Sequence, residues 1–251
     1  MEAYTDFAQV YDLFMDNVPY EEWCSYIRAI LSEYGIEDGF LLDLGCGTGK
    51  MTRLMADAGF DMIGLDASME MLEIAREQED GTRAKDILYL LQDMREFELY
   101  GTVRAVYSAC DCLNYILEEE DLLRVFQLVN NYLDPQGLFI FDINTPYKYQ
   151  TLLAENTFAE SREESSFIWE NYYDTDSCIN EYDLTIFVKE GELFRRFCEE
   201  HYQRCYLLET IQSLLAEAGM ELVACYDGYS RQPVRQDSER ITIVAREHGK
   251  A

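Results

Sequence analysis

Three glycines stand at alternate positions in "LLDLGCGTGKMT", directly after an apolar run and before a helical pattern. Gly45, Gly47 and Gly49 leave the backbone bare where its N–H groups and a helix dipole would meet ligand oxygens. A turn of this kind between a strand and a helix suits the close approach of a nucleotide. We therefore expect a nucleotide-like ligand beside these glycines, the alternative being a tight turn selected for packing alone.

Two phosphate-binding motifs fit this stretch poorly. The dinucleotide fingerprint places a glycine at its sixth position, where this chain has Lys50. A Walker A loop would need glycine in place of Leu44 and serine or threonine in place of Met51. Both phosphate-binding interpretations are therefore disfavoured.

Carboxylates follow the next two predicted strands. Asp66 ends the second strand, about twenty residues beyond Gly45, where a carboxylate accepts from both hydroxyls of a ribose. Asp93 follows the third strand in "LYLLQDMREF", where it would accept from an adenine amino group beside the backbone N–H of Met94. Taken alone, Asp93 is equally well a loop carboxylate. Together with Asp43 and the glycines it favours an adenosyl ligand.

Alternation of short apolar runs with helical patterns predicts the framework that holds these groups. Such an alternation is typical of a parallel, doubly wound α/β sheet with helices on both faces. The predicted strands lie near 40–44, 61–65, 87–91, 104–109 and 137–142, and the helices near 48–58, 68–78, 118–132 and 146–153.

Segments of different character flank this core. Residues 4–34 show helical periodicity with a break near Pro19, which predicts an N-terminal helical flap. Aromatic and β-branched residues with turn signals at "DTDS" and "KEGE" predict antiparallel strands over 155–206. A last helix through Leu207 to Leu215 and strands at 220–226 and 241–246 complete the chain.

One domain is expected over 1–251. We expect 36–153 and 207–246 to form its Rossmann-like core, with the flap of 1–34 and the β insertion of 155–206 together over the carboxyl ends of the strands, where open α/β sheets bind ligands.

The motifs "LLDLGCGTGKMT", "GLDASMEMLEIARE", "LQDMREF" and "YLDPQGLFIFDINTPYKY", in this order and spacing, resemble the class I S-adenosylmethionine-dependent methyltransferases over about residues 36–153. The flanks resemble mostly uncharacterised bacterial members, distantly similar to glycine and amino-sugar N-methyltransferases. The resemblance implies a seven-stranded sheet whose last strand is antiparallel. It also implies S-adenosyl-L-methionine as cofactor and S-adenosyl-L-homocysteine as product.

The same resemblance distributes the cofactor over particular positions. It implies that the methionine portion faces Asp43 and Gly45, that the ribose faces Asp66 and Ala67, and that the adenine faces Asp93 and Met94. Tyr11 of the flap would close over the methionine end. The full set of cofactor-binding residues expected on this basis is Tyr11, Asp43, Gly45, Cys46, Gly47, Asp66, Ala67, Met71, Gln92, Asp93, Met94, Cys110 and Asp111, the last two beneath the sulfonium.

The acceptor side is less sharply defined by sequence. After the fourth strand the chain reads "YSACDCLNYI", without the Asn/Asp-Pro-Pro-aromatic stretch that resembles enzymes methylating nucleic-acid amino groups or glutamine amides. Tyr11, His201 and Arg204 are expected to act in catalysis, because they combine an aromatic lid, a titratable ring and a planar donor fork. The alternatives are a core aromatic at Tyr11 and a surface ion pair at Arg204. Further acceptor-side candidates are Asn144, Tyr172 and Tyr229.

Charge and composition narrow the partners. With 49 acidic and 20 basic side chains, the formal charge of -29 repels phosphate backbones and anionic lipid. Nucleic acid is disfavoured as a partner, and no apolar run of membrane-spanning length or secretory leader occurs. The eight cysteines form no CxxC pair, so no metal site is expected. We expect a cytoplasmic protein, and its oligomeric state stays open.

The combined prediction is an S-adenosylmethionine-dependent methyltransferase that methylates a small-molecule acceptor, at nitrogen or oxygen, by in-line transfer. Three alternatives belong to other classes. They are methylation of RNA or of a ribosome-associated protein, a non-catalytic cofactor-binding module, and a nicotinamide-dependent oxidoreductase, the last disfavoured by Lys50 and Asp93.

Overall fold

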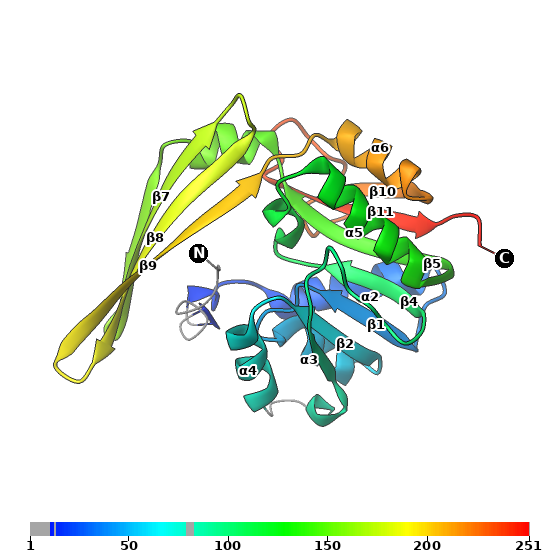
Figure 1. The fold of residues 1–251 in the computed structure, drawn as a ribbon, viewed down its shortest axis with the longest axis horizontal. Coiled ribbons are helices and arrows are strands. Elements are labelled where there is room, and N and C mark those ends of the chain that lie inside the picture. Colours follow the sequence, from blue (N-terminus) through cyan, green and yellow to red (C-terminus); the bar gives the residue numbers. More distant parts are fainter. Residues whose placement is uncertain (1–10, 13, 79–82, 251) are drawn as a thin grey trace.

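A computed structural model of the protein describes residues 11–12, 14–78 and 83–250. Its centre is a seven-stranded sheet of strand order β10-β11-β5-β4-β1-β2-β3 (Figure 1). The strands are β1 (Phe40–Leu44), β2 (Asp61–Asp66), β3 (Leu88–Leu91), β4 (Val103–Ser108), β5 (Leu133–Asn144), β10 (Met220–Asp227) and β11 (Arg240–Glu247).

Strand direction in this sheet confirms the predicted fold class. β1 pairs in parallel with β2 and β4, and the parallel pairing continues from β2 to β3 and from β4 to β5. β11 is inserted between β5 and β10 and runs antiparallel to both. The last strand of the chain is therefore the antiparallel one.

Helices cover both faces of the sheet, as a doubly wound arrangement requires. β1 shows why: Leu42 and Leu44 point into one buried cluster and Leu41 into the other, because successive strand residues face opposite sides. The first cluster is shared with α5 (Glu119–Tyr132) and α6 (Leu208–Glu217). The second is shared with α2 (Tyr20–Glu33) and α3 (Lys50–Asp57).

Local signals set the helix ends near the site. α3 begins after Gly49, whose φ of 73° lies in the left-handed region that glycine tolerates. α4 (Met69–Glu77) is capped by Ser68, whose Oγ accepts from the backbone N–H of Met71 at 3.2 Å. The predicted helix near 146–153 is present as a π-helix, η3 (Lys148–Leu153). Two short 3₁₀ helices, η1 (Ala84–Asp86) and η2 (Cys112–Tyr115), lie in connecting segments.

Between η3 and α6 the chain forms a separate antiparallel sheet, as predicted for this segment. Its strands are β6 (Thr157–Ser161), β7 (Ser165–Asp174), β8 (Ile179–Glu190) and β9 (Leu193–Arg204), in the order β6-β7-β8-β9. Figure 1 shows β7, β8 and β9 as long strands that project away from the seven-stranded sheet. The turns between them coincide with "DTDS" and "KEGE".

The N-terminal segment reaches this second sheet. The ring of Phe14 packs edge-to-face on that of Phe167 in β7, with 4.9 Å between the ring centroids. Asp16 forms an ion pair with Arg162, with an N–O distance of 2.8 Å. α2 then starts directly after Pro19, where the sequence predicts a break. The first predicted helix of the flap falls mostly on residues 1–10 and 13, which lie outside the described residues. Within the described chain, no helix has the length and apolar character to cross a membrane.

Candidate functional site

The glycine turn lies between β1 and α3. Gly45, Gly47 and Gly49 all have positive φ, and a Cβ added to Gly47 would meet no atom within 4 Å. Thr48 Oγ1 donates a hydrogen bond to Oδ1 of Asp12 in the flap at 2.7 Å, which connects the N-terminal segment to the turn. Beside the turn is a small pocket of about 50 Å³ whose lining includes Tyr11, Tyr20, Asp43, Gly45, Gly47 and Cys110.

Asp43 lies at the floor of this pocket. The carboxylate is buried and its Oδ2 accepts from Thr52 Oγ1 at 2.6 Å and from the Tyr107 hydroxyl at 2.9 Å. Burial raises the pKa of Asp43 to about 7, against the two hydrogen bonds, which lower it.

Asp66 ends β2 and holds the glycine turn. Its Oδ2 accepts from the backbone N–H of Gly47 at 2.8 Å, and its Oδ1 accepts from that of Ser68 at 2.8 Å. Burial raises the pKa of Asp66, and these backbone hydrogen bonds act in the opposite direction. The carboxylate thus stands at the junction of the turn and α4, where the sequence predicts a ribose.

The predicted adenine end is more open. Both carboxylate oxygens of Asp93 accept from Arg95, whose hydrogen bonds lower the pKa of Asp93. Gln92 accepts from the backbone N–H of Glu98 at 2.7 Å. Among the remaining predicted cofactor residues, Ala67 is exposed, whereas Cys46 and Met71 are buried. The side chain of Met94 lies close to Gly45: its Cε would be 3.6 Å from a Cβ added there. The structure thus brings Met94 to the turn, while a contact of Asp93 with adenine stays a prediction.

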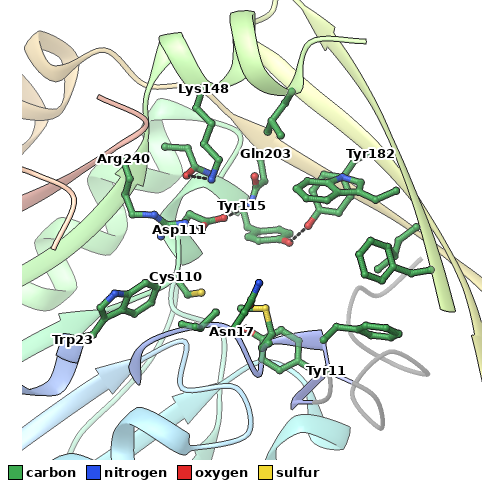
Figure 2. Close-up of a pocket in the computed structure, with 18 of the residues that line it drawn as sticks. Tyr11, Asn17, Trp23, Cys110, Asp111, Tyr115, Lys148, Tyr182, Gln203 and Arg240 are labelled. Atoms are coloured by element: carbon green, nitrogen blue, oxygen red, sulfur yellow. Dashed lines mark hydrogen bonds and ion pairs between the residues drawn. The ribbon is translucent and has the colours of Figure 1, made fainter. Parts of the chain in front are cut away.

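A larger cavity of about 460 Å³ adjoins the small pocket (Figure 2). It shares Tyr11 and Cys110 with the small pocket, so the two spaces meet at these side chains. Its walls come from the flap, from the ends of β4 and β5, and from β7, β8 and β9, and they include the aromatic side chains Phe14, Trp23, Tyr115, Phe167, Trp169 and Tyr182.

A network of charged groups forms one side of the cavity. Arg240, at the start of β11, pairs with Asp111 and with Asp142 of β5, and Asp142 is buried. Asp111 also accepts from Gln203 Nε2 at 2.7 Å, and Asp142 accepts from the Tyr229 hydroxyl at 2.6 Å. Burial, the largest single influence, acts to raise the pKa of Asp111. The charges of Arg240 and Lys148 and the hydrogen bonds from Gln203 and Arg240 together outweigh it, so the pKa lies below its usual value.

Two further groups of the cavity wall belong to β5 and η3. Lys148 donates from Nζ to Oδ1 of Asn144 at 2.9 Å. Burial, and next the charge of Arg240, lower the pKa of Lys148.

Cys110, which follows β4, also lines the cavity. Burial, and next the Asp111 carboxylate, raise the pKa of its thiol to about 12. A thiol held protonated in this way is a poor nucleophile at neutral pH.

The residues predicted for catalysis separate in the structure. Tyr11 lines both spaces. His201 is buried one layer behind the cavity wall, with Nδ1 at 3.2 Å from the Tyr115 hydroxyl. Arg204 points elsewhere: it donates to the carbonyl of Leu117 at 2.7 Å and pairs with Glu119 at 3.1 Å.

The other acceptor-side candidates also divide. Asn144 lines the cavity, whereas Tyr229 stands behind it and stacks on Trp23 at 4.0 Å. Tyr172 is half exposed on β7 and is not part of the lining.

Sequence reasoning did not select several groups of the cavity wall, namely Tyr115, Lys148, Tyr182, Gln203 and Arg240. Arg240 illustrates the reason, since it lies in "SERITI" at the start of a predicted strand with no motif around it. Its neighbour across the sheet is Asn144, which was selected, and the pairing of β11 with β5 brings the two together. In the described part of the chain, no cluster of His, Cys, Asp and Glu side chains is arranged to hold a metal ion.

Comparison with known proteins gives this geometry a family. Residues 41–137 match a family described as "Methyltransferase domain". The chain is 35% identical over 243 residues to the putative methyltransferase YqeM of Bacillus subtilis, covering 96% of each protein. A solved S-adenosylmethionine-dependent methyltransferase from Clostridium acetobutylicum superposes with a TM-score of 0.87 at 30% identity, covering 99% of this chain and 100% of that one.

A more distant relative has a named acceptor. The dTDP-3-amino-3,4,6-trideoxy-alpha-D-glucopyranose N,N-dimethyltransferase of Streptomyces venezuelae is 30% identical over 139 residues, which span 55% of this chain and 56% of that protein. The full-length matches, the fold and the glycine turn agree with one another. The chain therefore belongs to the class I S-adenosylmethionine-dependent methyltransferases, and S-adenosyl-L-methionine is its cofactor.

Proposed function

We propose that the enzyme methylates an amino nitrogen of a small molecule bound in the cavity between the seven-stranded sheet and the β6–β9 sheet. The observation that carries this proposal is the junction of the two spaces. The cavity and the glycine-turn pocket share Tyr11 and Cys110, so an acceptor in the first would adjoin the methionine end of a cofactor in the second.

The residues around the turn fit the cofactor. The open space beside Gly47 leaves room for a ligand against the backbone, and Asp66 offers carboxylate oxygens next to it. The small pocket is lined by Tyr11, Asp43 and Gly45, where the methionine end is expected, and the ribose and adenine would extend from it along Asp66, Met94 and Asp93. When bound, adenosylmethionine supplies the methyl group as an electrophile on a cationic sulfur.

Size and lining favour a small acceptor. A volume of about 460 Å³ is in the range of small-molecule sites, which span roughly 300–1,000 Å³. Aromatic side chains from the flap and the β6–β9 sheet exclude water from one side, and Arg240, Asp111 and Gln203 supply fixed polar atoms on the other. The charge of -29 adds an argument against nucleic acid.

Nitrogen is favoured over oxygen by the acceptor of a relative and by the polar lining. The amino-sugar dimethyltransferase acts, by its name, on an amine. In this cavity the carboxylate of Asp111 and the hydroxyls of Tyr115 and Tyr182 can all accept from an amino group. The protonated thiol of Cys110 competes poorly with an amine for the methyl group.

A labelled methyl-transfer screen tests the proposal. Cell extract is separated into metabolites, proteins and RNA, and each fraction is incubated with the enzyme and methyl-labelled adenosylmethionine. We expect label in the metabolite fraction, on an amine. Label confined to RNA or protein would contradict the proposal, and cofactor binding without label in any fraction would indicate a non-catalytic module.

Arg204→Ala is expected to keep methyl transfer within about twofold of the unchanged enzyme, contrary to the role expected from sequence. Its guanidinium contacts Glu119 and the Leu117 carbonyl and does not line the cavity. A partly exposed pair of this kind contributes about 0–1 kcal/mol to stability. The measurement is turnover of the identified acceptor, and a large loss of kcat with unchanged adenosylhomocysteine affinity would restore Arg204 to the acceptor site.

A further inference from the structure

A chain of four polar side chains leads from the cavity into the β6–β9 sheet. The hydroxyls of Tyr115 and Tyr182 contact each other at the cavity wall (Figure 2). Behind them, Nδ1 of His201 lies 3.2 Å from the Tyr115 hydroxyl, and Nε2 of His201 lies 3.2 Å from Oε2 of Glu199. The two ends of the imidazole therefore face a phenol and a carboxylate.

Strand geometry holds these groups in line. Glu199 and His201 are two residues apart on β9, so they share one face of the strand. His201 lies opposite Tyr182 of β8 in the sheet register. Their rings stack, with 4.7 Å between the ring centroids and an interplanar angle of 8°. Tyr115 arrives from η2, at the end of the seven-stranded sheet.

The two inner members of this chain of side chains, His201 and Glu199, are buried, which is unusual for polar groups that serve only packing. The side chains of His201 and Glu199 are 1% and 5% exposed. A carboxylate withdrawn from water is costly unless a partner stabilises it, and apolar residues at both positions would avoid that cost. A carboxylate beside an imidazole is, however, the arrangement that orients the ring and stabilises its protonated form.

A relay through this chain requires one particular tautomer of His201. Because an ionised carboxylate only accepts, a neutral His201 would carry its hydrogen on Nε2, on the side of Glu199. Nδ1 would then be the acceptor for the Tyr115 hydroxyl. The phenol oxygen of Tyr115 has two lone pairs, so it can accept from Tyr182 and from a further donor in the cavity.

From this arrangement we infer that Tyr115, His201 and Glu199 form a proton relay that deprotonates the amine acceptor. The inference rests on the proposed function. One proton of the acceptor ammonium moves to the Tyr115 oxygen as the Tyr115 hydroxyl proton moves to Nδ1 of His201. The freed nitrogen lone pair forms the N–C bond to the methyl carbon, and the sulfur keeps the electron pair of the broken C–S bond. The proton remains on the His201 imidazolium, beside Glu199.

The first arm of the test needs no acceptor. The chain has two histidines, so the variant His248→Gln leaves His201 as its single imidazole. Imidazole ¹⁵N NMR of this variant, at a pH where the ring is neutral, reports which nitrogen carries the hydrogen. We expect the hydrogen on Nε2. A hydrogen on Nδ1 would overturn the relay, because that nitrogen could not accept from Tyr115.

The second arm measures turnover. His201→Gln and Glu199→Gln are expected to lower kcat about 100-fold with KM within about threefold, because general-base catalysis contributes roughly 10²–10⁴-fold and neither side chain lines the cavity. His248→Gln is the matched control and should keep full activity. A folded His201→Gln enzyme with unchanged kcat would overturn the relay.

The two proposals fail separately. If the unchanged enzyme methylates no small molecule, the proposed function fails. The NMR measurement still shows whether Nδ1 of His201 can accept from Tyr115, as the relay requires. If it methylates an amine while His201→Gln is equally active, the proposed function stands and the relay is wrong.

Discussion

Arg240→Ala is expected to lower the free energy of unfolding by about 3–5 kcal/mol, the usual cost of removing one partner from a buried ion pair. The guanidinium is the shared cation of Asp111 and Asp142, of which Asp142 is fully buried. Without it, two carboxylates would face each other next to the cavity, and their hydrogen-bond donors would be Gln203, Tyr229 and the backbone N–H of Asp111. Urea unfolding followed by circular dichroism measures the change.

Arg246→Ala is the matched control for this measurement. Arg246 lies on the same strand, β11, but its pair with Glu221 at 3.0 Å is at the surface. Such a pair contributes about 0–1 kcal/mol, so the two alanine variants should differ by several-fold in their effect. Equal losses of stability in Arg240→Ala and Arg246→Ala would show that the network at the cavity does not depend on the charge of Arg240.

Asp66→Ala is expected to weaken adenosylmethionine binding by roughly 10-fold to 100-fold or more. Each hydrogen bond to a charged acceptor contributes on the order of 1.5–3 kcal/mol at most, and a carboxylate at the end of β2 would accept two from the ribose. The structure adds a second reason. Asp66 accepts hydrogen bonds from the backbone N–H groups of Gly47 and Ser68, so its loss should also loosen the turn beside which we propose that the cofactor binds.

Isothermal titration calorimetry with adenosylmethionine and adenosylhomocysteine measures this effect. Asp61→Ala is a suitable control, because Asp61 starts the same strand and pairs with Arg83 at 2.7 Å, away from the glycine turn. Its affinity should equal that of the unchanged enzyme. A folded Asp66→Ala variant that binds with full affinity would remove Asp66 from the cofactor site.

Local signals were sufficient to predict most of the fold. The strand before Gly45 and the helix after Gly49 form where the apolar run and the glycines indicate them, because backbone conformation there follows from residue type and short-range periodicity. The antiparallel hairpins of 155–206 likewise follow from alternating aromatic residues and two turns. The π-helical form of 148–153 did not follow, since the shift from α-helical hydrogen bonding has no distinct sequence pattern.

The methyltransferase family, the cofactor and the position of the glycine turn could be predicted from the sequence, because they depend on residues close together in the chain. Which side chains surround the larger cavity, the proposed acceptor site, depends instead on how distant segments pack together. Arg240 meets Asp111 only because β11 inserts beside β5, and His201 reaches Tyr115 only because β9 folds back against η2. Arg204, three residues further along the same strand, is directed instead to Glu119. The alternation of side chains along a strand separates its faces, but which face meets the cavity is set by packing between distant segments.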